Sequence, residues 1–99
     1  MEIIASGDSQ RRVLAISGRV DTNTSPQLQV EILKAFQTGK CVVLDFARVP
    51  YISSAGLRAL LIGQKTASSK GAVMELVNVN DMVMAVLNSV GFSKVLTIK

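Results

Sequence analysis

The sequence predicts an α/β fold, a single domain over residues 1–99 with a mainly parallel sheet, an antiparallel strand at its N-terminal edge and the element order β-β-α-β-α-β-α-β. Three observations support this prediction. Short runs rich in β-branched residues alternate with longer segments whose apolar residues recur every three or four positions. A glycine follows each longer segment, as is common where helices end. Alternating strands and helices need crossover connections, which favour parallel strands.

The N-terminal part of the chain is predicted to form two strands and one helix. Residues 2–5 and 11–17 are expected to pair as a hairpin, because a serine- and glycine-rich turn cluster separates them. Ser25 is expected to cap the first helix, since the following Pro26 fits a first helical turn. Gly39 is expected to close this helix.

The central part is predicted to form a buried strand, a helix and a second strand. Residues 40–46 are continuously apolar over most of their length, which is typical of a strand covered on both faces in a parallel sheet. Within it, Cys41 is expected to be a small buried hydrophobic residue rather than a reactive thiol. Residues 54–69 show helical spacing, and residues 72–77 are predicted as the next strand.

The C-terminal part is predicted to form a third helix and a final strand. Asn80 is expected to cap the helix and Gly91 to end it, and the last strand is expected over residues 94–98. The apolar stripe that defines this helix consists of Val83, Val86, Leu87 and Val90.

Charge and hydropathy exclude several classes of partner. The net charge is +4, but the basic residues are scattered and no aromatic residues alternate with them, so nucleic-acid binding is not expected. No apolar run approaches the about 20 residues that a membrane-spanning helix requires. The first residues do not resemble a secretory signal. We therefore expect a cytoplasmic protein that contacts neither nucleic acid nor membrane.

The absence of histidine excludes much enzyme chemistry. Without it there is no Ser–His–Asp triad and no imidazole base, and with one cysteine there is no zinc site of the usual thiolate and imidazole type. No glycine-rich phosphate-binding loop of the nucleotide-binding type is present. We expect no catalytic residues, no metal and no cofactor.

The segment from Leu44 to Leu61 carries the most information about function. The buried strand that contains Asp45 is followed by a short loop, then Ser53 and Ser54, then an amphipathic helix. One interpretation is that these serines only cap the helix, a contribution worth about 1 kcal/mol. The other adds a phosphoryl group, because the free N–H groups and the dipole of a helix N-terminus favour an anion.

This segment resembles the signature of the STAS domain of bacterial anti-sigma factor antagonists. The family pattern is a strand ending in Asp, then an aromatic or apolar pair, then two small polar residues before Ala/Ser-Gly-Leu, and here residues 51–57 read Tyr-Ile-Ser-Ser-Ala-Gly-Leu. Residues 17–21 (Ser-Gly-Arg-Val-Asp), residues 24–26 and residues 90–92 (Val-Gly-Phe) resemble further parts of the family pattern. The resemblance covers essentially the whole chain.

The resemblance implies roles for particular residues. Ser54 matches the phosphoacceptor serine, and Asp21 matches an aspartate close to it; from the residues alone, Asp21 and Asp45 equally fit turn residues that bond to nearby backbone. Ser53 stands where many members have Asp. The residues expected near the phosphorylation site or in partner binding are Asp21, Ser53, Ala55, Gly56, Leu57 and Arg58. Replacing Ser54 with Ala is expected to remove about 1 kcal/mol of capping energy.

The resemblance implies partner switching. The unphosphorylated antagonist would bind an anti-sigma factor that is also a serine kinase of the histidine-kinase-like ATPase type, phosphorylation would separate the two proteins, and a metal-dependent serine phosphatase would restore binding. The ATP and the metal belong to those enzymes. Two alternatives stay open: a STAS subunit of a transport or stress-signalling complex that does not switch, and a switch with a non-transcriptional output.

Overall fold

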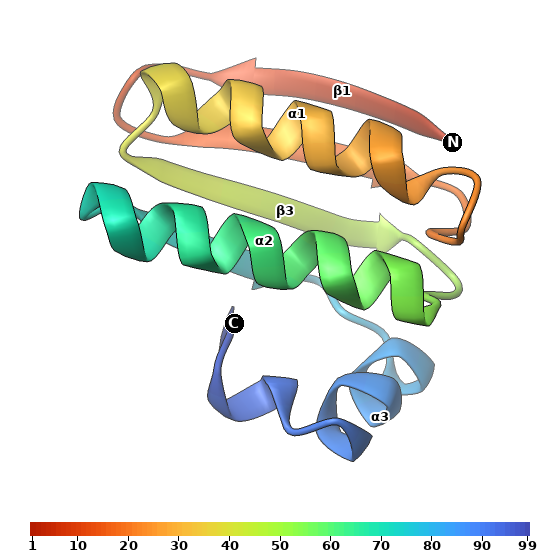
Figure 1. The fold of residues 1–99 in the computed structure, drawn as a ribbon. Helices are drawn as coiled ribbons and strands as arrows, with labels where there is room; N and C mark the ends of the chain where they lie inside the picture. Colours follow the sequence, from red (N-terminus) through yellow and green to blue (C-terminus); the bar gives the residue numbers. More distant parts are fainter.

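The computed structural model describes residues 1–99 and has two main layers, a five-stranded sheet and two helices packed on it (Figure 1). The strands lie in the order β1-β2-β3-β4-β5, with β1 antiparallel to β2 and all other neighbours parallel. This confirms the predicted fold class and element order. The elements are β1 (Glu2–Gly7), β2 (Arg12–Ser17), α1 (Ser25–Thr38), β3 (Cys41–Arg48), α2 (Ser54–Lys70), β4 (Val73–Val77), α3 (Asp81–Ser89), the 3-10 turn η1 (Phe92–Lys94) and β5 (Thr97–Ile98).

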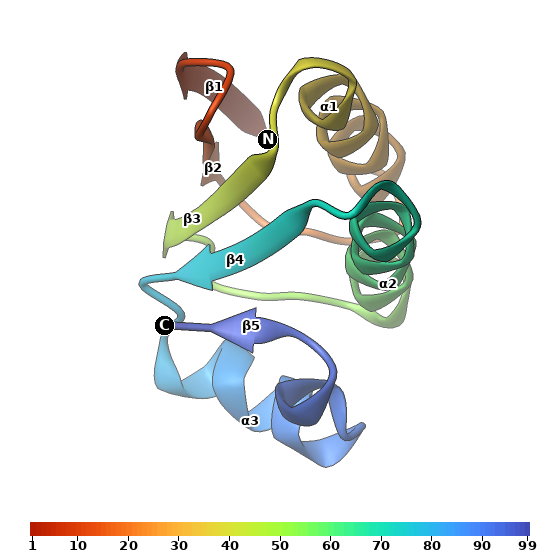
Figure 2. The same ribbon diagram turned by 90° about the vertical axis from the view of Figure 1, so that its left-hand side faces the viewer.

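Helices α1 and α2 cover one face of the sheet, and α3 lies beside the edge formed by β5 (Figure 2). This follows from the strand order. Strands β2, β3 and β4 are added one after another in a single direction, and right-handed crossovers then place α1 and α2, which connect them, on the same side. The other side, called the open face, is formed by alternate strand residues, namely Ile4, Val13, Ala15, Cys41, Val43, Asp45, Val73, Glu75 and Val77.

The hydrophobic core lies between the sheet and its helices. Strand residues that point toward the helices, such as Leu14, Leu44 and Leu76, are at most 1% exposed. The prediction that β3 is buried on both faces is wrong, because no helix covers the open face. Cys41 is accordingly half-buried rather than buried. Val43 still falls to 2% exposure, since its neighbours on β2 and β4 surround it.

The start of α1 differs from the sequence prediction. Ser25 is the first helical residue and is buried, and the capping position falls on Thr24, whose side chain makes no capping hydrogen bond. The preceding turn supplies a backbone acceptor in place of a capping side chain, because the carbonyl oxygen of Asp21 accepts the Ser25 N–H at 2.8 Å. A residue upstream of the predicted cap therefore organises the helix entry.

The C-terminal part also departs from prediction in two places. Asn80 caps α3 as expected, accepting the Val83 N–H at 2.8 Å, but the helix ends at Ser89 and Val90 is 48% exposed. Val90 is the residue that follows the helix, and Gly91 after it has φ 77°, a left-handed conformation that turns the chain, so Val90 does not complete the apolar stripe. The predicted strand over residues 94–98 is shortened to β5, because residues 92–94 form η1 instead.

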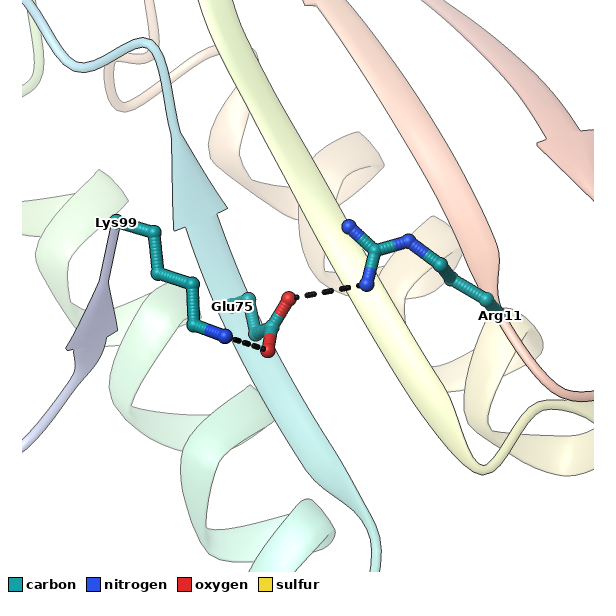
Figure 3. A network of polar contacts seen from close by, with 3 residues as sticks. All are labelled: Arg11, Glu75 and Lys99. Atoms are coloured by element: carbon teal, nitrogen blue, oxygen red, sulfur yellow. Dashed lines mark hydrogen bonds and ion pairs between the residues drawn. The ribbon is translucent and has the colours of Figure 1, made fainter.

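A carboxylate with two cationic partners lies on the open face (Figure 3). Glu75 of β4 is 7% exposed, and its Oε2 lies 2.9 Å from Lys99 Nζ while its Oε1 lies 3.3 Å from Arg11 Nη1. The hydrogen bond from Lys99 holds the pKa of Glu75 below its usual value, although burial opposes the shift. The three residues join the start of β2, the middle of β4 and the last residue of the chain.

Candidate protein-binding site at the carboxyl end of the sheet

The predicted site residues come together where β2 and β3 end. This region, called the carboxyl end, consists of residues 18–24 after β2 and residues 48–58 between β3 and the second turn of α2. A parallel bridge between Val20 and Ile52 joins the two segments. The Val20 N–H donates to the Tyr51 carbonyl at 3.0 Å, and the Ser53 N–H donates to the Val20 carbonyl at 2.8 Å. The backbone therefore places Asp21 next to Ser53, as the topology requires.

Ser53 and Ser54 occupy different positions at the start of α2. Ser53 is the capping residue, and its Oγ accepts the Gly56 N–H at 3.5 Å, a long bond. Ser54 is the first helical residue, is exposed, and has no hydrogen bond to its hydroxyl. The expectation that Ser54→Ala removes capping energy is therefore wrong, because the cap belongs to Ser53. The Ser54 hydroxyl is free to react without loss of a structural contact.

Gly56 allows the first turn of α2 to lie directly on the Val20–Ile52 bridge. A Cβ atom at this position would lie 2.7 Å from Cγ1 of both Ile52 and Val20. Leu57 is 8% exposed and points into the core. These two residues hold the helix in place from beneath, while Ser54 and Arg58 are exposed and Ala55 is half-buried.

Asp21 stabilises the turn that leads into α1. Its Oδ1 accepts the Asn23 N–H at 3.0 Å and the Thr24 N–H at 3.1 Å. Desolvation opposes ionisation, but these backbone hydrogen bonds outweigh it and hold the pKa of Asp21 below its usual value. No hydrogen bond joins the Asp21 carboxylate to either serine. Asp21 lies near Ser53 because the Val20–Ile52 bridge joins their two segments.

Asp45 has a comparable local role on the open face. Its Oδ1 accepts the Ala47 N–H and the Asn78 side-chain N–H, each at 3.0 Å. Asn78 has φ 58°, so the contact holds the chain in a left-handed turn after β4. Asp45 therefore ties the ends of β3 and β4 together.

The surface offers no candidate metal centre and no enclosed pocket at the serines. No group of three or more metal-ligating side chains is present in the chain. A hollow of about 280 Å³ lies on the open face, lined in part by Ile4 and Ala15, and another of about 440 Å³ lies at the opposite end of α1 and α2. Ser54 lines neither of these hollows nor a third one beside α1, and it lies on the exposed surface. None of the helices is long and apolar enough to cross a membrane.

Comparison with known proteins identifies the family. The family model described as the STAS domain matches residues 2–99. The chain belongs to the STAS domain family. This STAS domain is 28% identical over 88 residues to the anti-sigma F factor antagonist of Paenibacillus polymyxa, a match that covers 87% of this chain and 75% of that protein.

Solved structures share the fold of this STAS domain. The anti-sigma factor antagonist SpoIIAA in its unphosphorylated form superimposes with a TM-score of 0.77 at 17% identity, over 99% of this chain and 87% of that chain. A sulfate transporter family protein from Wolinella succinogenes superimposes with a TM-score of 0.77 at 27% identity, over 87% of this chain and 70% of that chain.

One pair of exposed side chains in this STAS domain was not found by sequence reasoning. The guanidinium carbon of Arg19 lies 4.7 Å from the centroid of the Tyr51 ring. The two residues are 32 positions apart, and only the Val20–Ile52 bridge sets them side by side. No local sequence pattern signals this pair, because each residue stands one position before its bridging neighbour and the bridge itself is formed only in the folded chain.

Proposed function

We propose that this STAS domain is an anti-sigma factor antagonist whose binding to an anti-sigma factor with serine kinase activity is released by phosphorylation of Ser54. The observation that carries the proposal is the separation of roles at the start of α2. Ser53 caps the helix, so the exposed Ser54 hydroxyl has no structural bond to lose on modification. The anti-sigma F factor antagonist of Paenibacillus polymyxa, 28% identical, supports the general role.

The physical effect of phosphorylation at Ser54 favours a switch without refolding. The first turn of a helix carries free N–H groups and the positive end of its dipole, so a phosphoryl group is tolerated there. The modification replaces a small neutral surface by about two negative charges, and lowers the net charge from +4 to about +2. A partner that contacts this turn then meets both bulk and charge.

The kinase, the phosphatase and their cofactors lie outside this chain. The kinase is proposed to be of the histidine-kinase-like ATPase type, and a metal-dependent serine phosphatase would regenerate the binding form. The anti-sigma factor antagonists of the STAS family are non-enzymatic regulators, which agrees with a binding role for this chain. The setting in which the switch would operate is the bacterial cytoplasm.

Affinity capture from the lysate of the native host tests the proposal. Wild-type and Ser54→Asp proteins serve as baits, and Ser68→Asp, which places the same charge at the far end of α2, is the matched control. Wild type and the control are expected to capture the same ATPase-like kinase, and Ser54→Asp is not. Incubation of the wild type with that kinase and ATP, followed by peptide mass spectrometry, should place the phosphate on Ser54 and not Ser53. Equal capture by wild type and Ser54→Asp would refute the switch.

A second candidate is a STAS subunit that does not switch. The sulfate transporter family protein from Wolinella succinogenes, at 27% identity, supports this candidate. A subunit of a transport or stress-signalling complex would keep one stable partner, whose binding is indifferent to charge at Ser54. The same capture experiment distinguishes the candidates, because all three baits would then retain one non-kinase assembly. A switch with a non-transcriptional output would behave as the first proposal does, with a different partner downstream.

A further inference from the structure

Three exposed arginines at the carboxyl end make no salt bridge. Arg19 follows β2, Arg48 ends β3, and Arg58 lies one turn beyond Ser54 on α2. The ion pairs of the chain are made by other cations elsewhere, at Glu31 and Glu75. The nearby carboxylates of Asp21 and Asp45 are already bonded to backbone N–H groups and to the Thr24 and Asn78 side chains. The carboxylate of Asp21 offsets part of the Arg19 charge, but residues 18–24 and 48–58 contain three arginines and only this one carboxylate. The carboxyl end therefore keeps a net positive charge.

The Arg19–Tyr51 pair is held in a defined geometry. Val20 and Ile52 point inward at 0% and 2% exposure, so the residue before each of them points outward. The guanidinium carbon of Arg19 lies 4.7 Å from the centroid of the Tyr51 ring, and this stacking already restricts the arginine side chain. A partner that binds the guanidinium therefore costs little further side-chain entropy. Tyr51 is 38% exposed, and tyrosine and arginine are over-represented among residues that dominate binding energies at protein interfaces.

We propose that Arg19 and Tyr51, together with Arg58, dock an acidic surface of the kinase beside Ser54. The proposal rests on the proposed function and adds the chemistry that the partner must present. A planar guanidinium with free N–H groups favours bidentate contact with carboxylates. Nucleic acid is disfavoured as the occupant, because the cations are few and only a single aromatic ring accompanies them.

The same arrangement explains how phosphorylation would release the partner. Ser54 and Arg58 are four residues apart on α2, and side chains at this spacing are neighbours on a helix surface. A phosphoryl group on Ser54 would compete with the partner's carboxylates for Arg58 and repel them by like charge. Docking and release would therefore depend on the same arginine.

Binding to the purified kinase, identified by capture with the wild type, tests this inference. The variants are Arg19→Ala, Tyr51→Ala and Arg58→Ala, and the control is Lys40→Ala, which removes an exposed cation at the opposite end of β3. Each variant is expected to raise Kd at least tenfold, and the control less than twofold. The arginine variants should also flatten the salt dependence of the association rate. Arg19→Lys keeps the charge but not the planar stack, so it should recover only part of the affinity.

Phosphorylation kinetics separate docking from chemistry. With Arg19→Ala as the substrate, KM for phosphorylation should rise at least tenfold while kcat stays within twofold, because Ser54 itself is unchanged. Melting curves that match the wild type exclude unfolding as the cause, and Arg19 is exposed, so its loss removes no core packing.

The outcomes are distinct. If the wild type neither binds the kinase nor is phosphorylated by it, the proposed function fails. If the wild type binds and the three variants bind equally well, the function stands and this inference is refuted. If the variants lose affinity for a DNA duplex probe but not for the kinase, the cationic surface serves nucleic acid and the inference is again refuted.

Discussion

At the scale of single residues, the neighbouring serines Ser53 and Ser54 have different surroundings. Ser53 bonds to the helix and Ser54 faces solvent. Ser53→Ala is expected to lower the free energy of unfolding by about 0.5–1 kcal/mol, the low end for a cap because the bond is long. Ser54→Ala is expected to change it by less than about 0.5 kcal/mol. Urea denaturation of both variants measures the difference, and the reverse ranking would show that Ser54 is the cap.

Gly56 makes a second prediction at this scale. The added methyl of Gly56→Ala meets Val20 and Ile52, both β-branched and both buried in the core, so neither can turn aside. We expect a loss of about 1–3 kcal/mol in stability and a tilt of the first turn of α2. Gly63 in the same helix is the comparison, since one of its two closest atoms belongs to the flexible Met74 side chain, and Gly63→Ala should cost less. Thermal melting of both variants checks the ranking.

At the scale of elements, Glu75 links β4 to the residue before β2 and to the residue after β5, and makes stability depend on pH. Its pKa is lower in the folded protein than the usual 4.5, so the unfolded chain takes up the proton first as the pH falls. The stabilisation is thus fully present above about pH 4.5 and is lost as the pH falls through the folded pKa. Glu75→Gln should lower stability by roughly 1–2 kcal/mol near pH 7.

Comparison of wild type and Glu75→Gln across pH 3–7 isolates this contribution. Asp8 and Asp21 also have lowered pKa values, so both proteins should lose stability in acid. The gap between the two urea denaturation curves should close as the pH falls. A gap that stays constant to pH 3 would mean that the pKa of Glu75 does not differ between the folded and unfolded states, and would contradict the lowered pKa.

Elements were predictable where the information is local, and less so where it is not. The glycines and apolar spacing located each helix, and the cap at Asn80 was correct because its bond spans only three residues. The entry of α1 was wrongly assigned to Ser25, since Asp21 organises it from four residues upstream. The Glu75 network and the Arg19–Tyr51 stack join distant positions, which periodicity cannot reveal.

At the scale of the whole molecule, the fold is expected to stay unchanged when the switch operates. The Ser54→Asp variant places a carboxylate at a helix start, where the dipole favours it, so its melting temperature should lie within a few degrees of the wild type. In two-dimensional NMR spectra, shifts of amide signals should be confined to the carboxyl end. Changes spread over β1 and the far ends of α1 and α2 would indicate refolding and contradict a surface switch.

The bridge between Val20 and Ile52 also gives the molecule a built-in reporter. The Ser53 amide proton is donated to the Val20 carbonyl at 2.8 Å, one residue from the proposed phosphoacceptor. Its exchange with deuterium requires only that this bridge opens, whereas exchange in the central strand β3 requires much of the sheet to open. The ratio of the two rates therefore compares local opening beside Ser54 with global unfolding. A docked kinase should slow exchange at the Ser53 amide, which should still remain faster than exchange in β3.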